Sequence, residues 1–218
     1  MDGSLNYERL YEYRFRGVDQ ASKQAVWNEI GSYVYGLLGD PDRILDPCAG
    51  RCEFLNAIDC KERWSVDQVD NSGFRDPGIR AVTSDIFDAD LPEGHFDGVF
   101  VSNFLEHLLS QEDVARFLSK MLTCMESGGR IAVVGPNFKY VSRDYFDCAD
   151  HTLALTHVAV AEHLYAAGFT VDEVVPRFLP FSFRGLLPPS PRLTRYYLGM
   201  RPAWRLLGKQ FLLVASKR

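Results

Sequence analysis

The chain lacks any apolar run of the ~20 residues that a membrane-spanning helix needs, and its polar first residues lack the apolar core of a signal peptide. Its 218 residues are 46% hydrophobic and 24% charged, which is ordinary for a globular protein. A chain of this length can bury one large core. We therefore expect a single domain over residues 1–218 that works in the cytoplasm.

The chain also lacks the cysteine spacings of a disulfide framework or a metal site. It has five cysteines, an odd number, which fits reduced thiols. Cys48 and Cys52 suggest an iron–sulfur loop, but such a loop needs a third cysteine three residues further on, where Leu55 stands. A structural zinc site needs a second Cys/His pair at short spacing, which is absent. We therefore predict no metal site.

Acidic residues are missing from the last part of the chain. The net charge is -5, and from Arg177 onward nine basic residues meet no Asp or Glu, so the remainder carries -14. This asymmetry indicates an anionic partner for the basic segment, or a solvated surface that balances an acidic body. Nucleic acid is disfavoured as a partner, because the acidic body would repel it and no nucleic-acid motif is present.

Apolar runs and turn residues predict helices and strands in alternation. The first 40 residues, with an apolar stripe at Val26, Ile30 and Val34, predict a helical cap. Further helices are predicted over residues 111–125 and 158–167. The predicted strands are residues 43–46, 64–67, 79–83, 96–102, 130–135, 169–175 and 211–215.

Strands that alternate with helices indicate a doubly wound, Rossmann-like α/β fold with a mostly parallel, seven-stranded sheet. No regular helix is predicted between the last two strands, so we expect an antiparallel edge strand. The connection between them, about residues 177–209, is a basic, aromatic-rich insert. It is too long for a hairpin loop, and loops of this length are usually functional.

Three of the predicted strands end in an acidic residue: Asp46, Asp67 and Asp85. Parallel strands deliver these side chains to the carboxyl edge of the sheet, where doubly wound folds bind their ligands. Carboxylates accept hydrogen bonds from ribose hydroxyls and from an adenine amine. The sequence therefore predicts a nucleoside pocket at this edge.

The order and spacing of these strands resemble the class I S-adenosylmethionine (SAM)-dependent methyltransferases. Residues 102–108 (SNFLEHL) resemble the segment after the family's fourth strand, and residues 121–134 (MLTCMESGGRIAVV) resemble its helix, Gly-Gly turn and fifth strand. The family usually places three alternating glycines after the first acidic residue. Here Cys48, Gly50 and Cys52 take these places, so only the central glycine is kept.

The resemblance implies SAM as the cofactor and a set of residues that bind it. Asp67 would hold the ribose diol, with Gln68 lining the adenine. Asp85 would accept from the adenine amine, with Ile86 packing on the ring. The other implied contacts lie in the first loop, where small residues let the backbone approach, and at the methionine end: Asp46, Pro47, Cys48, Ala49, Gly50, Asn103 and Phe104.

Five further segments resemble one subgroup of these enzymes, whose members accompany polysaccharide or glycoconjugate biosynthesis. This resemblance implies a saccharide acceptor. It also implies that Arg14 approaches the SAM carboxylate, a natural target for a guanidinium group. Arg14 as a surface residue at a helix entry is an equal alternative. The five segments are residues 11–15, 136–137, 150–151, 177–180 and 204–210.

Methyl transfer from a sulfonium to a hydroxyl needs alignment and benefits from a general base, most often histidine. Residues 144–151, after the fifth strand, combine aromatics, carboxylates and a histidine. We predict His151 as the base, with Asp147 or Asp150 orienting it or binding a sugar hydroxyl; a loop-anchoring histidine is the alternative. His107 is the second candidate base. The other histidines have structural places: His95 in a loop, His157 capping a helix and His163 on a helix surface.

The insert at residues 177–209 alternates apolar clusters with arginines and allows three interpretations. It could form a lid over a lipid- or diphosphate-linked sugar, with arginines facing phosphate, or touch a membrane surface. It could bury a homodimer interface, or it could complete the core. The apolar clusters are Phe181, Phe183, Leu186 and Leu187, then Tyr196, Tyr197 and Leu198, then Trp204, Leu206 and Leu207.

The leading hypothesis is a SAM-dependent methyltransferase acting on a hydroxyl of a saccharide or another small metabolite. N-methylation of an amino sugar or small amine is a second hypothesis, since an amine needs only to be neutral and positioned. A catalytically inactive binding protein is a third, because two of the three usual glycines are replaced. Against it, Asp46, Asp67 and Asp85 are all in place.

Overall fold

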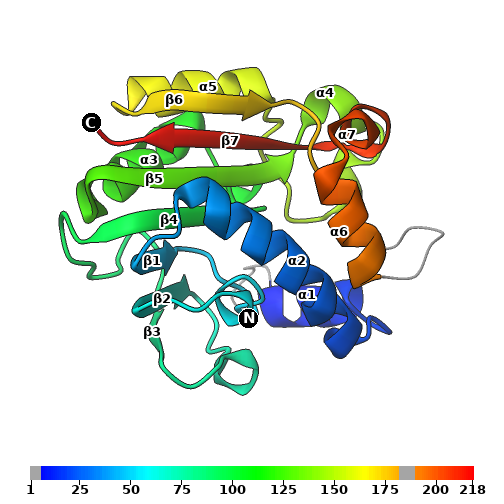
Figure 1. The fold of residues 1–218 in the computed structure, drawn as a ribbon, viewed down its shortest axis with the longest axis horizontal. Coiled ribbons are helices and arrows are strands. Elements are labelled where there is room, and N and C mark those ends of the chain that lie inside the picture. Colours follow the sequence, from blue (N-terminus) through cyan, green and yellow to red (C-terminus); the bar gives the residue numbers. More distant parts are fainter. Residues whose placement is uncertain (1–5, 182–189) are drawn as a thin grey trace.

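A computed structural model describes residues 6–181 and 190–218. Seven strands form one sheet in the order β3-β2-β1-β4-β5-β7-β6, with helices on both of its faces (Figure 1). The prediction of a seven-stranded α/β fold is therefore confirmed. The strands are β1 (Arg43–Asp46), β2 (Glu62–Asp67), β3 (Ile79–Thr83), β4 (Phe96–Ser102), β5 (Met125–Pro136), β6 (Thr170–Val175) and β7 (Gln210–Ser216).

The sheet is parallel from β3 through β5 and changes direction at β7. Strand β7 pairs antiparallel with both β5 and β6, so the reversed strand lies one place in from the edge that β6 forms. The prediction that no regular helix stands between β6 and β7 is wrong. Two short helices stand there, α6 and α7, and each has a proline in its first turn, where a missing backbone N–H costs nothing.

The helical cap expected over the first 40 residues is two helices rather than one. The Asp19 side chain caps the second of them by accepting a hydrogen bond from Ser22 N, and Gly39 ends it in the left-handed conformation (φ 88°). The helices are α1 (Tyr7–Arg14), α2 (Gln20–Leu38), α3 (Gln111–Cys124), α4 (Phe138–Val141), α5 (His157–Ala166), α6 (Pro191–Gly199) and α7 (Arg201–Leu207).

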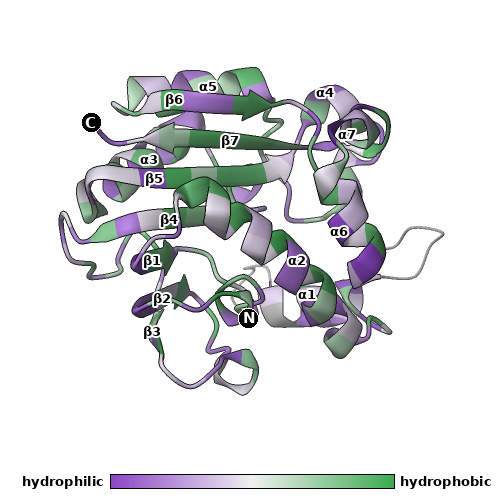
Figure 2. Ribbon diagram, viewed as in Figure 1, coloured by the Kyte–Doolittle hydropathy of each residue, from purple (hydrophilic) through white to green (hydrophobic). Residues whose placement is uncertain are grey.

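Two hydrophobic cores lie on the two faces of the sheet, because neighbouring strand residues point to opposite sides. Ile44 and Phe100 pack in the core that α2 covers. Leu45 and Val101 pack in the core that α3 and α5 cover. The central strands β5 and β7 are accordingly hydrophobic along much of their length (Figure 2).

The connections among the first four strands contain no α-helix. A short 3-10 turn, η1 (Leu55–Ala57), stands between β1 and β2 and packs against α2. Gly31 makes this close approach possible, since a Cβ there would lie 2.7 Å from the Cβ of Ala57. Helix α2 therefore covers the part of the sheet that the missing crossover helix leaves open.

The described part of the insert completes the core on the α2 side. Trp204 is 3% exposed, and its ring meets that of Phe178 at 5.1 Å between centroids, with Tyr33 of α2 stacked on Phe178. Arg195 donates two hydrogen bonds to Glu29 of α2, at 2.8 and 2.7 Å. Of the residues named above for the insert, Phe183, Leu186 and Leu187 lie outside the described residues.

Within residues 6–181 and 190–218, no helix has the length and apolar character needed to cross a bilayer. The helices α1 and α4 lie toward the end of the sheet to which β6 points (Figure 1). This end is the carboxyl edge of the parallel strands, where the acidic residues of β1 and β2 also lie.

Candidate active site

The first strand ends in a buried carboxyl group. Asp46 is 4% exposed, and its Oδ1 accepts a hydrogen bond from Cys48 N at 3.2 Å. Burial raises the pKa of Asp46 to about 8. The loop that follows turns sharply, with positive φ at Gly50 (50°) and at Cys52 (58°). Cys52 stands at the third glycine position of the family. Its backbone therefore has a conformation that glycine adopts more easily than other residues.

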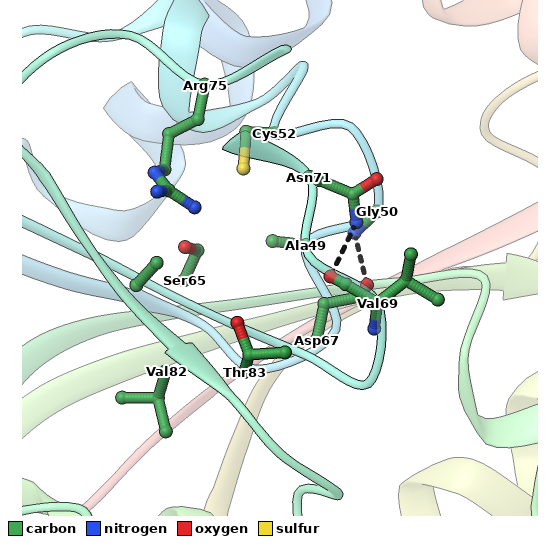
Figure 3. Close-up of a pocket in the computed structure, with 11 residues that line it drawn as sticks. Ala49, Gly50, Cys52, Ser65, Asp67, Val69, Asn71, Arg75, Val82 and Thr83 are labelled. Atoms are coloured by element: carbon green, nitrogen blue, oxygen red, sulfur yellow. Dashed lines mark hydrogen bonds between the residues drawn. The ribbon is translucent and has the colours of Figure 1, made fainter. Parts of the chain in front are cut away.

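The Asp67 carboxylate at the end of β2 ties this loop to the sheet. Its Oδ2 accepts from Gly50 N at 2.8 Å (Figure 3), and its Oδ1 accepts from Val69 N at 2.9 Å. Burial raises the pKa of Asp67, whereas these backbone N–H groups lower it. Each oxygen has a second lone pair for another donor. Space is open beside Gly50, since a Cβ there would meet nothing within 4 Å.

Asp85 and Gln68 meet at the same edge. Gln68 Nε2 donates to Asp85 Oδ2 at 2.7 Å, and Phe87 N donates to Asp85 Oδ1 at 2.8 Å. Ile86 is 5% exposed and packs in the core on the α3 side. The carboxylates expected at the ends of β2 and β3 are thus adjacent groups, each already oriented by a backbone donor.

A small cavity lies behind the Asp67 carboxylate, between the first loop and strands β2 and β3 (Figure 3). Its volume is about 10 Å³, room for one water-sized molecule. Ser65, Cys52 and Arg75 line it. A nucleoside is far larger than this cavity and cannot fit inside it.

The other residues expected around the cofactor lie along the same edge. Asn103 has a positive φ of 49°, and its backbone N donates to Val134 O at 2.9 Å, so the chain turns directly after β4. Phe104 packs on Phe117 of α3, with ring centroids 4.9 Å apart. In the first loop, Pro47 and Ala49 are buried and Cys48 is half-buried.

Carboxylates from four segments surround the Cys48 thiol. Burial raises the pKa of this thiol, and the negative charges of Asp46, Asp67, Asp85 and Glu106 raise it further. The cofactor edge and the segment after β4 therefore converge near one point. Cys48 is a thiol at neutral pH rather than a reactive thiolate.

A second polar cluster begins where α1 meets the segment after β5. Arg14 Nη2 forms an ion pair with Asp150 Oδ1, and the Asp150 side chain is only 1% exposed. Burial acts to raise the pKa of Asp150, but the hydrogen bond from Arg14 and the nearby His107 hold it below its ordinary value. Arg14, predicted to approach the SAM carboxylate, is thus engaged with a carboxylate of the chain itself.

The two candidate bases, His107 and His151, join this cluster. His107 Nδ1 lies 2.9 Å from the Asp150 backbone O and 3.6 Å from its Oδ2. The two imidazole rings are 5.2 Å apart between centroids, and the His151 ring is 4.8 Å from that of Tyr145. The structure therefore brings together Arg14, His107, Asp150 and His151, which are distant in sequence.

Several buried polar atoms of this cluster have no hydrogen-bond partner. Across the described residues five buried side-chain nitrogen or oxygen atoms are unpartnered, and three of them are Glu106 Oε1, Asp150 Oδ2 and His151 Nδ1. Burial raises the pKa of Glu106 to about 7. Burial, and then the neighbouring His107, lower the pKa of His151 to about 4. Buried polar atoms normally have partners, so this cluster is suited to a polar ligand.

The remaining candidates lie elsewhere. Asp147 is exposed and, within the described chain, makes none of the contacts that join the other members of the cluster. His157 does not cap α5, because the cap is Thr156, whose side chain accepts from Ala159 N. His157 Nδ1 instead lies 2.9 Å from Asn137 Nδ2. A hydroxyl fits the capping position better than imidazole, as it is small enough to reach the first turn.

Sequence reasoning missed Glu106, although it included the segment that contains it. The side chain is 2% exposed, and together with His107 it interrupts the apolar residues between Phe104 and Leu109. An acidic residue within such a run is the signal that indicates a buried functional carboxylate. Tyr11 of α1 was also missed; burial and the neighbouring Asp150 raise its pKa.

Comparison with known proteins agrees with this geometry. Residues 43–133 match the Methyltransf_11 family, a methyltransferase domain. A SAM-dependent methyltransferase from Archaeoglobus fulgidus has a TM-score of 0.68 at 21% identity, covering 97% of this chain and 100% of its own. A SAM-dependent methyltransferase from Thermotoga maritima gives 0.67 at 13% identity, covering 97% and 96%.

A third solved structure is similar over nearly its whole length. It is the Haloferax volcanii protein in complex with the Trm112 methyltransferase activator, with a TM-score of 0.69 at 15% identity, covering 98% of this chain and 99% of its own. A search of curated protein sequences gives no match. The structural likenesses, all below 25% identity, establish the fold.

The domain match and the fold together define the class of protein. Residues 43–133 are a methyltransferase domain, and the whole chain has the class I SAM-dependent methyltransferase fold. The domain match is that of a methyltransferase, and the similar structures include SAM-dependent methyltransferases, whose cofactor is SAM. The residues at the carboxyl edge fit this cofactor, because Asp67 and Asp85 offer oriented acceptors beside the open space at Gly50.

Proposed function

We propose that this protein transfers a methyl group from SAM to a hydroxyl of a saccharide or another small polyhydroxylated metabolite. The observation that carries the proposal is the set of unpartnered buried atoms Glu106 Oε1, Asp150 Oδ2 and His151 Nδ1. Carboxylate oxygens and an unprotonated imidazole nitrogen are hydrogen-bond acceptors. A molecule with several hydroxyl groups supplies the donors that such a site lacks.

The residues of the edge have separate tasks in this proposal. Asp67 accepts from the ribose hydroxyls, Gln68 and Asp85 hold the adenine, and the first loop lets the backbone approach the ligand. Asn103 and Phe104 would face the methionine end, and Arg14 would approach the SAM carboxylate from its place beside Asp150. When bound, SAM supplies the electrophilic methyl group and the thioether leaving group.

His151 accepts the proton of the attacking hydroxyl in this proposal. Its lowered pKa keeps the imidazole neutral at pH 7, so Nδ1 can take a proton. Asp150, held by Arg14, stabilises the positive charge that His151 gains when it takes the proton. Asp147 stands at the exposed rim of the same segment, where it could bind a sugar hydroxyl.

An anionic or lipid-linked acceptor agrees with a second pocket. This open pocket of about 420 Å³ is lined by Arg177, Arg201 and Arg205 together with Tyr140 and Trp204. Guanidinium groups suit phosphate and aromatic rings suit a sugar face. Arg177 is held by the backbone oxygens of Gly208 and Leu206, so its position in this pocket is fixed.

We place the reaction in the cytoplasm. None of the five cysteines, all of which lie in the described residues, forms a disulfide, and a reducing compartment maintains this state. The basic segment after Arg177 meets an anionic membrane surface or a second copy of the chain in this proposal, and its described residues Leu206 and Leu207 are exposed. Sedimentation with anionic and neutral vesicles, and mass determination in solution, separate these arrangements.

The test is methyl uptake from labelled SAM by a panel of nucleotide sugars, lipid-linked sugars and amines. We expect label on a hydroxyl, and we expect His151→Ala to lose turnover while SAM affinity is kept. Label on an amine that survives His151→Ala points to N-methylation instead. SAM binding without transfer to any acceptor class points to the inactive binding protein.

A further inference from the structure

Three side chains with metal-binding atoms converge within the proposed acceptor site. Glu106, His107 and His151 each offer one ligand atom, and these atoms all lie within 4.8 Å of one another. Glu106 and His107 follow β4, whereas His151 follows β5, so two neighbouring strands supply the group. Among the described residues, this is the group of His, Cys, Asp and Glu side chains that meets such a spacing.

The hydrogen bond of His107 fixes which nitrogen faces the group. Its Nδ1 lies 2.9 Å from the Asp150 backbone O, and a carbonyl oxygen only accepts, so Nδ1 must donate. The lone pair of neutral His107 is then on Nε2, which lies 3.9 Å from Glu106 Oε1. Histidines that ligate metals usually donate their other nitrogen to a carbonyl or carboxylate in this way.

The other two ligand side chains carry the unpartnered atoms described above. Glu106 Oε1 and His151 Nδ1 are buried and have no hydrogen-bond partner. Their lack of partners is an observation independent of their spacing, since a hydrogen-bonded network could hold the same residues equally close. Leaving buried polar atoms unpartnered is costly, and a bound cation removes that cost for both together.

We propose that Glu106, His107 and His151 form a binding site for a divalent transition-metal ion. Two imidazoles and one carboxylate with open positions are a known donor set for such ions, including zinc. Ligand atoms at ~2.1 Å from a tetrahedral ion lie about 3.4 Å apart. The three side chains must therefore close by about an ångström to bind such an ion, and His151 is half-buried. The prediction of no metal site was based on the spacing of the cysteines, and Glu106, His107 and His151 did not enter that argument.

Three protein ligands leave coordination positions for oxygen atoms of another molecule. If the ion expands to five-coordinate, two neighbouring hydroxyl oxygens of the acceptor fill the open positions; this step alone rests on the proposed function. A diol held in this way would place one hydroxyl beside the methionine end of SAM. His151 then acts as a ligand and not as the base, so the two roles make different predictions.

The experiment is calorimetric titration of the tag-free, chelator-treated full chain with Zn²⁺, Mn²⁺ and Co²⁺, and with Mg²⁺ for comparison. We expect one ion per chain, with micromolar or tighter binding of at least one transition metal and weaker binding of Mg²⁺. Glu106→Gln and His151→Ala should each weaken the binding at least about 100-fold. The bound Co²⁺ spectrum should show nitrogen and oxygen ligands. His163→Ala is the matched control, because His163 pairs with Gln111 away from the cluster.

Two results would overturn the inference. One is the absence of binding by any of the three transition metals, and the other is unchanged binding in both Glu106→Gln and His151→Ala. Circular dichroism of the same samples shows that each variant is folded, and SAM titration is carried out beside it. Metal binding without SAM binding would leave this inference standing and remove the proposed function. SAM binding and methyl transfer without metal binding would do the reverse.

Discussion

Arg14 of α1 forms an ion pair with Asp150, a residue that lies 136 positions further along the chain. The contact fastens the N-terminal helix over the carboxyl edge of the sheet. It also holds the segment whose backbone oxygen receives the His107 hydrogen bond. One pair of charges therefore links the helical cap, the segment after β4 and the segment after β5.

Replacing Arg14 should destabilise the protein as well as the site. Arg14→Ala leaves the Asp150 carboxylate, 1% exposed, without its counter-charge, and breaking a buried pair in this way costs about 3 kcal/mol. Urea denaturation measures this change. Arg16→Ala, two residues on, should change stability by less than about 0.5 kcal/mol. If the double variant Arg14→Ala/Asp150→Asn is no more stable than Arg14→Ala, the pair is not the cause.

Asp46 should make stability fall as pH rises. Its pKa is about 8 in the folded protein and about 3.9 in an unfolded chain. Between these values the folded state keeps a proton that the unfolded state has lost, so stability decreases by up to about 1.4 kcal/mol per pH unit. Below about pH 4 both states are protonated and the effect is absent.

Asp46→Asn removes this titration while keeping an oxygen for Cys48 N. The pH range from 5 to 8 lies between the two pKa values, about 4 and about 8. Across this range we therefore expect the variant to become increasingly more stable than the unsubstituted protein. Urea denaturation at several pH values measures the gain, and exposed Asp90→Asn is the control. Parallel curves for Asp46→Asn and the unsubstituted protein would show that Asp46 is ionised in the fold.

Replacing Asp67 should weaken SAM binding, whereas replacing the nearby Asp70 should not. Asp67→Ala removes the expected ribose acceptor and the tie to Gly50 N, so SAM affinity should fall by about 10- to 100-fold, the loss of charge-assisted hydrogen bonds worth roughly 1.5–3 kcal/mol. Asp70→Ala, an exposed residue whose Oδ1 accepts from Ser72 N, should leave the affinity unchanged. Equal affinity for both variants would remove Asp67 from the cofactor site.

Gly31 and Gly36 of α2 should respond in opposite ways to alanine. A Cβ at Gly31 would lie 2.7 Å from that of Ala57, so Gly31→Ala should cost about 1–3 kcal/mol by pushing η1 off the helix. At Gly36 a Cβ meets nothing within 4 Å, so Gly36→Ala should stabilise the helix by about 0.5–1 kcal/mol. Thermal unfolding of both variants checks the sign; a stabilised Gly31→Ala would mean that η1 does not pack there.

The strands could be predicted because each buried strand is a short apolar run bounded by turn residues. The predicted bounds of β1, β3 and β4 agree with the structure. Helices α6 and α7 could not be found in the same way, because their prolines and exposed arginines hide the apolar stripe that packs on α2. A proline within a pattern normally argues against a helix, and only its position in the first turn reverses that argument.

Contacts in the site between segments that are distant in sequence could not be predicted either. Asp67 and Asp85 could be placed together because parallel strands end at one edge, which local sequence indicates. The meeting of Arg14, Glu106 and Asp150 depends on how α1 crosses that edge, and no local periodicity contains this information. The pairing of α1 with the segment after β5 is therefore a property of the tertiary structure alone.

Titration of the purified protein with SAM and with S-adenosylhomocysteine by calorimetry tests the central claim most directly. We expect both to bind with micromolar affinity at one site per chain, because Asp67, Asp85 and the open side of Gly50 offer the contacts that a nucleoside needs. Absence of binding by either molecule, in protein shown by circular dichroism to be folded, would contradict the claim. It would mean that the loop with Cys48 and Cys52 has closed the cofactor site.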